Sequence, residues 1–337
     1  MAGKKAYRLF EKLVDPIHLR NSAKQAKKGV GFTPQVSEFF FDLEQNVLVL
    51  SDELKTGSYY PRPFDVFVVN DNKPRLIQAA HFRDRVVHHA ICSLIVPFLE
   101  RSYLANSYAC QKGKGTHKAL QKAKQLVKQY SWVAKLDIFH FFETIPHERL
   151  LFYLRKRIAD KRLMAVLQKI LAHGHSAYAD DCGLPIGNLT SQHFGNFYLD
   201  VLDHRMKEQF GVQDFVRYMD DIVLFADSKR DLIDQISLTQ AFLETDLWLR
   251  LKDSETRISP VEHGFPFFGF RLYQGKTRLS LTRKRKLKNK LKMITSLSEQ
   301  EQYKRLPSII HWSEQAQTRQ LRKNWLERCW LEQTRTE

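Results

Sequence analysis

Residues 215–225, with the sequence FVRYMDDIVLF, decide the fold. Apolar and β-forming residues lie on both sides of the adjacent Asp220 and Asp221, which predicts two strands joined by a tight acidic turn. Two carboxylates this close raise each other's pKa unless a cation neutralises them. The pattern therefore indicates a hairpin that carries a site for a hard metal ion. An exposed acidic turn would explain the dipeptide, taken alone, about equally well.

A third aspartate favours the metal site. Residues 132–138 (WVAKLDI) predict a short apolar strand, and Asp137 stands at its end, where a carboxylate is poorly placed unless it binds something. If this strand lies beside the hairpin, Asp137, Asp220 and Asp221 converge and could hold two Mg²⁺ ions about 4 Å apart, as in phosphoryl transfer. Mg²⁺ prefers oxygen ligands, so we expect no histidine or cysteine in the site.

The composition favours a nucleic acid partner. The chain of 337 residues has 43% hydrophobic and 27% charged residues, which is typical of a globular protein rather than a disordered one. Lysine and arginine total 54 against 37 acidic residues, a net charge of +17. Such an excess implies a polyanionic partner. Nucleic acid is favoured over anionic lipid because the sequence shows no amphipathic helix with a clear membrane face.

Targeting and cysteine patterns exclude several classes of protein. The sequence has no run of about 18 apolar residues, which would predict a membrane span, and its start lacks the apolar stretch of a secretory signal. We therefore expect a cytoplasmic protein with no membrane partner. The four cysteines lie far apart and form no C-x-x-C pair, which argues against a zinc site or a disulfide framework.

The order of the expected elements predicts an α+β fold. Residues 1–60 carry helical patterns, the strongest at 39–54, and two short strands are expected at 64–69 and 73–77. From there, helices alternate with strands, which indicates a mixed core followed by a helical, basic segment. Helices are expected at residues 84–99, 147–172, 190–210 and 236–247, and a strand pair is expected at 265–272.

Six blocks of this sequence, in order along the chain, resemble the motifs of bacterial reverse transcriptases. They are KPRLI at 73–77, SYA at 107–109 with KGKGTH at 112–117, LDIFHFFETIPH around Asp137, the loop 183–192, YMDD at 218–221, and FGF at 268–270. The likeness covers about residues 60–275, and six ordered blocks make a coincidence improbable.

The resemblance implies a right-hand polymerase in three parts. An N-terminal helical extension would span residues 1–60, fingers and palm 61–275, and a basic helical thumb 276–337. The implied activity is RNA-directed DNA polymerase, in which template RNA, a primer or cDNA, dNTPs and Mg²⁺ meet in the palm. The implied catalytic residues are Asp137, Asp220 and Asp221, and the implied metal-binding set is Asp137, Ile138, Asp220 and Asp221.

The resemblance also assigns residues that contact the incoming nucleotide. Lys73 and Arg75 would neutralise the triphosphate. The alternative interpretation is that both are ordinary exposed basic residues. Phe142 matches the bulky ring that excludes a ribose 2′-OH, so that the product is DNA; alternatively it is a core residue beside Phe139 and Phe141.

The loop 183–192 (GLPIGNLTSQ) points to one lineage within the family. Most reverse transcriptases carry glutamine where Ile186 stands and proline where Gln192 stands. The form found here is similar to the enzymes of diversity-generating retroelements, which copy a template RNA carelessly at adenines. The likeness makes Ile186, Gly187 and Gln192 part of the substrate site. Glutamine can hydrogen-bond near the nascent base pair and isoleucine cannot, so we hypothesise that Ile186 lowers fidelity.

One position departs from the family pattern. Relatives often carry, just before the position of Thr256, a lysine proposed to protonate the leaving pyrophosphate, and Glu255 stands there in this chain. Lys252 or Arg257 would have to substitute, or proton donation is less optimised, and we assign none of them as catalytic.

The segment after the palm blocks is strongly basic. Seven of the ten residues at 283–292 (RKRKLKNKLK) are lysine or arginine, which fits a thumb helix that follows the phosphate backbone of a primer–template duplex. A solvated charged face is the alternative for such a run.

Other interpretations of the whole chain stay open. It could belong to another bacterial lineage of reverse transcriptases, such as antiphage defence enzymes, retrons or minimal group II intron enzymes, although the loop 183–192 argues against the last two. It could also be an inactive RNA-binding scaffold, against which the presence of all three aspartates argues. The resemblance further implies a small basic accessory protein and a structured RNA as partners.

Overall fold

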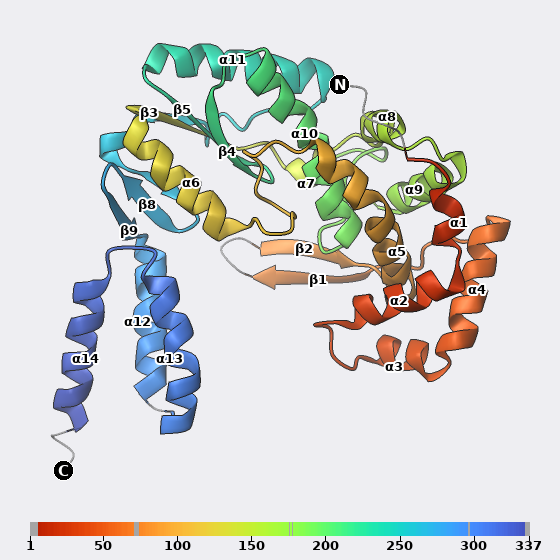
Figure 1. Ribbon diagram of the computed structural model, residues 1–337, viewed down its shortest axis with the longest axis horizontal. Coiled ribbons are helices and arrows are strands. Elements are labelled where there is room, and N and C mark those ends of the chain that lie inside the picture. Colours follow the sequence, from red (N-terminus) through yellow and green to blue (C-terminus); the bar gives the residue numbers. More distant parts are fainter. Residues whose placement is uncertain (1–5, 71–73, 175, 177, 296, 334–337) are drawn as a thin grey trace.

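A four-stranded antiparallel sheet positions the acidic turn (Figure 1). The structure is a computed structural model and describes residues 6–70, 74–174, 176, 178–295 and 297–333. The strands follow the order β4-β5-β3-β6. They are β3 (Trp132–Leu136), β4 (Asp214–Tyr218), β5 (Asp221–Ala226) and β6 (Arg257–Pro260). The strands predicted on both sides of the acidic turn, and the strand predicted before Asp137, are confirmed.

Burial on both faces explains why these strands are apolar without interruption. In β5, Ile222 and Leu224 belong to one hydrophobic core, whereas Val223 and Phe225 belong to a second core on the opposite face. Strands buried on both faces need no alternation of apolar and polar residues. The helices that cover the sheet are α10 (Leu189–Glu208) and α11 (Lys229–Asp246) on the first face and α6 (Thr116–Gln129) on the second.

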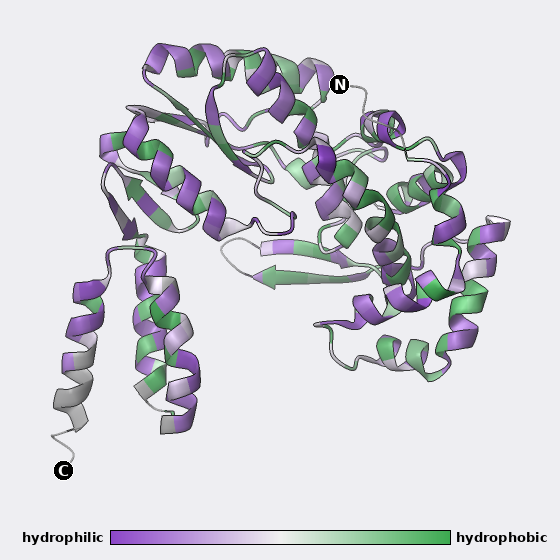
Figure 2. Ribbon diagram, in the orientation of Figure 1, coloured by the Kyte–Doolittle hydropathy of each residue, from purple (hydrophilic) through white to green (hydrophobic). Residues whose placement is uncertain are grey.

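A separate hairpin, called the fingers hairpin below, lies in the region that the sequence predicts as fingers. In the described part of the chain, strands β1 (Asp65–Asn70) and β2 (Pro74–Ala79) form a two-stranded sheet, and Val66 to Val69 are all exposed. Figure 2 shows the apolar character of β1, which stands out from the body of the molecule. The residues that connect the two strands, including Lys73, lie outside the described part of the chain.

The N-terminal part is helical, as the sequence predicts, but its helices are shorter. The single helix expected at residues 39–54 is wrong because Asp42 adopts a non-helical conformation (φ −128°, ψ 60°) and begins a new helix. Aspartate favours helix starts over helix interiors, since its side chain competes for backbone hydrogen bonds. The helices are α1 (Leu9–Leu13), α2 (Pro16–Lys27), α3 (Pro34–Phe41) and α4 (Leu43–Thr56), and they pack around α5 (Phe82–Leu99).

The helix predicted at residues 147–172 is also interrupted. Asp160 accepts hydrogen bonds from the backbone N–H groups of Arg162 and Leu163 and so begins a second helix. The segment from Asp137 onward therefore contains the short α7 (Phe141–Thr144), then α8 (His147–Arg157) and α9 (Lys161–His173).

The C-terminal part starts with a small sheet and continues as three helices. Within the segment 276–337 predicted as the thumb, residues 276–279 form a strand that pairs with its neighbour across the turn at Gly275 (φ 80°). The three-stranded sheet contains β7 (Phe265–Phe267), β8 (Phe270–Tyr273) and β9 (Lys276–Leu279). The helices α12 (Leu281–Thr295), α13 (Glu299–Ser313) and α14 (Arg319–Gln333) extend away from the body in Figure 1.

Helices and antiparallel strands are thus mixed along the chain, and the predicted α+β class is confirmed. None of the helices in the described ranges is long and apolar enough to cross a membrane.

Candidate active site

The register of the sheet brings the three aspartates to one edge. Strand β3 pairs antiparallel with β5, and Leu136 lies opposite Ile222. Asp137 follows Leu136 and Asp221 precedes Ile222, so these two aspartates leave the sheet at the same end. Tyr218 lies opposite Asp221 in the β4–β5 pair, which leaves only Met219 and Asp220 in the turn.

The aspartates interact electrostatically. Burial raises the pKa of the Asp137 carboxyl, and the charge of Asp221 raises it further, while Lys135 and Lys252 act in the opposite direction. Burial raises the pKa of Asp220 to about 6, and the charges of Asp221 and Asp137 contribute to this shift. Mutual repulsion of this kind is relieved by a bound cation, and carboxylate oxygens are ligands that Mg²⁺ prefers. The donor set therefore fits magnesium.

A lysine supplies part of the missing positive charge. Lys135 Nζ lies 2.9 Å from Asp221 Oδ1. In this arrangement, no three histidine, cysteine or acidic side chains among the described residues form a ready-made metal site. A divalent cation bound by all three aspartates would share the Asp221 carboxylate with Lys135 or displace the lysine from it.

The loop after β3 is hydrogen-bonded to the segment that precedes β6. Ile138 forms an antiparallel bridge with Leu251, and the backbone N–H of Lys252 donates to the Asp137 carbonyl over 2.8 Å. The Ile138 side chain is buried and has no donor atom, so only its backbone carbonyl could bind a metal. Lys252 Nζ lies 3.6 Å from Glu255 Oε1. Glu255, which stands where relatives carry a lysine, thus forms an ion pair with Lys252, one of the residues that would have to substitute for that lysine.

Of the residues predicted to contact the incoming nucleotide through its triphosphate or sugar, Arg75 and Phe142 lie in the described part of the chain. Arg75, on β2, is exposed, and its charge acts on Asp220 by lowering the pKa of that carboxyl. The Phe142 ring is half-buried beside Phe141, with ring centroids 5.2 Å apart. Both rings pack on Gly195 of α10, where a Cβ atom would lie 3.1 Å from Phe141 Cε1 and 3.3 Å from Phe142 Cε1.

The loop 183–192 is attached to the fingers hairpin. The backbone N–H of Gln78 donates to the Ile186 carbonyl over 3.0 Å. Asn188 Oδ1 accepts from the N–H of Ala80 over 2.9 Å, and its Nδ2 donates to the Gln78 carbonyl over 3.1 Å. Gly187 has φ 115°, and a Cβ there would lie 2.8 Å from Ile77 Cγ2, so this position requires glycine.

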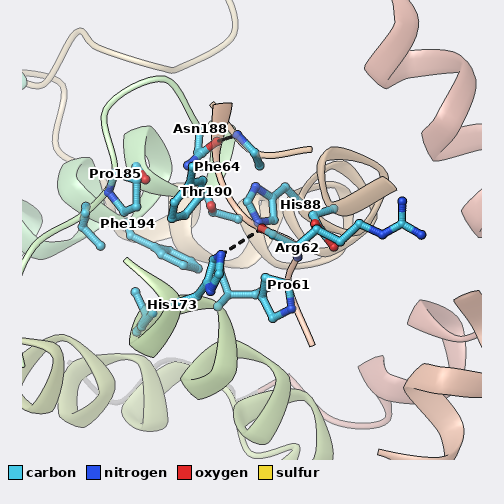
Figure 3. Close-up of a pocket in the computed structure, with 15 residues that line it drawn as sticks. Pro61, Arg62, Phe64, His88, His173, Pro185, Asn188, Thr190 and Phe194 are labelled. Carbon is cyan, nitrogen blue, oxygen red and sulfur yellow. Dashed lines mark hydrogen bonds between the residues drawn. The ribbon is translucent and has the colours of Figure 1, made fainter. Parts of the chain in front are cut away.

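The base of this loop lines a narrow pocket against the helices below it. Figure 3 shows Pro185, Asn188 and Thr190 of the loop around this pocket, together with His88 of α5 and His173 of α9. His173 Nε2 donates to the Arg62 carbonyl over 2.8 Å. The histidine thus links α9 to the chain that leads into the fingers.

Gln192, the last residue of the loop, is exposed. Cys110 Sγ donates to Gln192 Oε1 over 3.8 Å, which joins the loop 183–192 to the segment between α5 and α6. In this way the structure places Ile186 and Gly187 against β2 and places Gln192 against the SYA block.

Backbone strain gathers around the same edge. Apart from Arg8 at the start of α1, the described residues that combine a positive φ (41° to 54°) with a side chain other than glycine are Cys110, His140, Met219, Trp248 and Phe268. They occupy the loops around β3, β4 and β5, and the Phe268 ring lies 5.0 Å from the ring of Tyr218. Such conformations cluster at functional sites, where surrounding contacts hold them in place.

Sequence reasoning missed Lys135, Asn188 and Arg217. Arg217 is fully buried, and its guanidinium forms an ion pair with Asp203 of α10. The signal was available, because an arginine inside the apolar stretch FVRYMDD can be buried only with a carboxylate partner. The identity of that partner was not available from local patterns.

Comparison with known proteins agrees with this geometry. The family described as "Reverse transcriptase (RNA-dependent DNA polymerase)" matches residues 69–272, more than half of the chain. "Protein YkfC" of Escherichia coli is 27% identical over an alignment of 273 residues that covers 68% of this chain and 72% of that protein.

Other relatives are named for introns. The "Putative COX1/OXI3 intron 2 protein" of Saccharomyces cerevisiae is 26% identical over 40% of this chain, and "Nuclear intron maturase 1, mitochondrial" of Arabidopsis thaliana is 22% identical over 35%. The chain spans only 16% and 18% of these two proteins. The matched region contains all three aspartates and the loop 183–192, and the chain belongs to the reverse transcriptase family of RNA-dependent DNA polymerases.

Proposed function

We propose that Asp137, Asp220 and Asp221 form the catalytic centre at which this enzyme copies an RNA template into DNA. The observation that carries the proposal is the electrostatic coupling of Asp137 and Asp220 with Asp221 at the end of β3 and β5. The charge of Arg75, which acts on Asp220 from the fingers, supports a site that lies between fingers and palm.

In the proposed reaction, a primer 3′-hydroxyl attacks the α-phosphate of a dNTP. A new P–O bond forms, the bond between the α- and β-phosphates breaks, and pyrophosphate leaves. Bound Mg²⁺ ions would stabilise the charge on the attacking and leaving oxygens. The three carboxylates would hold the divalent cations, with the Ile138 carbonyl as a further oxygen.

Residues around the aspartates would orient the nucleotide. Arg75, with Lys73 beside it in the sequence, neutralises the triphosphate. The Phe142 ring, which packs on Gly195, would exclude a ribose 2′-OH. Ile186, Gly187 and Gln192 line the substrate site near the nascent base pair. Exposed basic residues of α12, whose Leu287 and Leu291 are buried, follow the phosphate backbone of the duplex.

Primer extension tests the catalytic centre. The full chain is assayed with poly(rA), oligo(dT), dTTP and Mg²⁺, beside the variants Asp137→Asn and Asp220→Asn. Each variant should lose at least about 100-fold in rate, because an amide provides no negative charge for the metal. Asp234→Asn, at an exposed position on α11, serves as the matched control and should keep its activity. An Asp220→Asn variant that extends the primer at the rate of the unmodified enzyme would refute the assignment.

We further propose that the enzyme serves a diversity-generating retroelement, is error-prone at template adenines and works with a small basic accessory protein. The loop 183–192, with isoleucine at 186 and glutamine at 192, supports this lineage. Sequencing of RNA that co-purifies with the protein, and of cDNA made from a defined template, tests the proposal. Errors spread evenly over the four template bases would refute it. A co-purified intron RNA would favour instead an intron-encoded enzyme, to which the relatives named for introns point.

We also propose a division of the chain into a helical extension (1–60), fingers and palm (61–275) and thumb (276–337). Because β9 pairs with β8, the sheet β7-β8-β9 joins the last two parts.

A further inference from the structure

Arg217 lies directly below the acidic turn and is completely enclosed. Its Nε lies 2.7 Å from Asp203 Oδ1, and its Nη2 lies 2.5 Å from Asp203 Oδ2. Both side chains have 0% exposure. This two-pronged ion pair fixes the plane of the guanidinium, because arginine and carboxylate match in geometry as well as in charge.

The remaining donors of Arg217 bind three other residues. Nη2 donates to Ser107 Oγ over 3.0 Å, and Nη1 donates to Asn196 Oδ1 over 2.9 Å. Nη1 also donates to the backbone carbonyl of Met219 over 3.2 Å. A guanidinium has five N–H donors. With Asp203 included, every one of them has an acceptor, and Met219 is the only acceptor that belongs to the turn.

The orientation of the Met219 carbonyl is coupled to that of the Asp220 side chain. Met219 has φ 54°, a conformation that a side chain other than glycine keeps only when its surroundings hold it. Its carbonyl belongs to the same peptide unit as the N–H of Asp220, whose nitrogen is bonded to the Cα that carries the carboxylate, and this N–H lowers the pKa of that carboxyl. A rotation of this peptide plane would therefore turn the carboxylate as well.

We propose that Arg217 is a positioning residue that, fixed by Asp203, orients the Met219–Asp220 peptide and through it the Asp220 carboxylate toward the metal. The inference rests on the proposed function for the role of Asp220. Arg217 touches neither substrate nor metal, and its effect passes through the turn.

The neighbouring SYA and KGKGTH blocks gain a role from the same arrangement. Lys114 Nζ donates to the carbonyls of Leu104, Ala105 and Ser107 over 3.1, 3.2 and 2.6 Å, which holds the loop that presents Ser107 to Arg217. Lys114 thus supports the acidic turn indirectly, through Ser107 and Arg217.

A pair of variants separates positioning from plain structural support. Arg217→Met alone leaves Asp203 as a buried unpaired charge and should destabilise the fold. The double variant Arg217→Met/Asp203→Leu removes both charges and should melt near the unmodified protein, because apolar residues of similar volume often replace a buried ion pair without loss. It still lacks the hydrogen bond to Met219.

Two readouts decide the outcome. Mn²⁺ binding, followed by electron paramagnetic resonance in the absence of nucleotide, should weaken about 10- to 100-fold in the double variant. In primer extension, kcat should fall while KM for dTTP stays within about twofold, because the nucleotide contacts are intact. A double variant that binds Mn²⁺ and turns over like the unmodified enzyme would overturn the inference.

Further variants keep the test decisive. If the double variant does not fold, Arg217→Lys, which retains the charge but not the fork, should show the same weakening of Mn²⁺ binding in a folded protein. Wild-type Mn²⁺ affinity in Arg217→Lys would then count against the inference. Arg83→Met is the matched control, since Arg83 is a buried arginine paired with Asp84 and Glu53 away from the turn. It should lower stability and leave Mn²⁺ affinity unchanged.

The proposed function can fail separately. If the unmodified protein binds Mn²⁺ but does not extend a primer, the polymerase proposal fails, while the Mn²⁺ titrations still decide the role of Arg217.

Discussion

Lys135 and Asp221 form an ion pair across the β3–β5 register, with Lys135 Nζ 2.9 Å from Asp221 Oδ1. The lysine and a divalent cation would compete for the same carboxylate. This competition makes the charge at Lys135 a determinant of the metal requirement.

Replacement of Lys135 should strengthen the binding of Mg²⁺. In Lys135→Met, the competing charge is gone, and the Mg²⁺ concentration for half-maximal primer extension should fall about two- to fivefold, as expected for a partly exposed ion pair worth ~0.5–1 kcal/mol. Mg²⁺ titrations of the initial rate measure the effect. Lys128→Met, at an exposed position on α6, is the control and should match the unmodified enzyme. A higher Mg²⁺ requirement in Lys135→Met would mean that the lysine holds Asp221 in place for the metal.

The sugar selectivity should depend on the Phe142 ring. Phe142→Val opens the space that the ring fills, and the ratio of rNTP to dNTP incorporation should rise about 10- to 200-fold, the range for removal of steric bulk from a pocket. Gly195→Ala adds a Cβ 3.3 Å from Phe142 Cε1, so it should lower dNTP use without raising rNTP use. Single-nucleotide insertion kinetics give both ratios. Unchanged selectivity in Phe142→Val would assign the ring to the core alone.

Fidelity should depend on the side chain at 186. The backbone carbonyl of Ile186 accepts the hydrogen bond from Gln78, so Ile186→Gln leaves the attachment of the loop intact. The added amide can hydrogen-bond near the base pair, and the error rate at template adenines should fall. Deep sequencing of cDNA measures the spectrum, with Ile233→Gln on the exposed face of α11 as the control. An identical spectrum in Ile186→Gln would contradict the hypothesis.

Stability should vary with pH through Asp200. Burial and the charge of Asp203 raise the pKa of the Asp200 carboxyl to about 6, while a hydrogen bond from Ser102 lowers it in part. Between about pH 4 and pH 6, the folded state binds a proton that the unfolded state has released, so the free energy of unfolding decreases as the pH rises through this window.

Asp200→Asn removes this titration. The melting temperature of the variant minus that of the unmodified protein should therefore be larger at about pH 7.5 than at about pH 4.5. Both proteins are melted without divalent cations. Asp220, whose pKa is raised in the same direction, is present in both proteins and cancels in the comparison. A difference in melting temperature that is the same at both pH values would exclude Asp200 as the source.

The local sequence determined the parts of the site that lie in short, regular segments. The strands around Asp220 and Asp221 and the strand before Asp137 follow from apolar patterning, which depends only on near neighbours. The six ordered blocks predicted the reverse transcriptase family, and the family match over residues 69–272 confirms this prediction. Helix boundaries were less well predicted, because Asp42 and Asp160 begin new helices inside patterns that are otherwise continuous.

Only the tertiary structure decided which charges meet. Lys135 and Arg217 look alike in the sequence, as single cations in apolar strands, yet one pairs with Asp221 at the exposed edge and the other with Asp203 in the core. Asp221 lies on β5, and the register of β5 with β3 sets its distance from Lys135. Asp203 lies on α10, and the packing of this helix on the sheet sets its distance from Arg217. Because an ion pair depends on the separation of two charges and on their burial, residue type alone does not fix it.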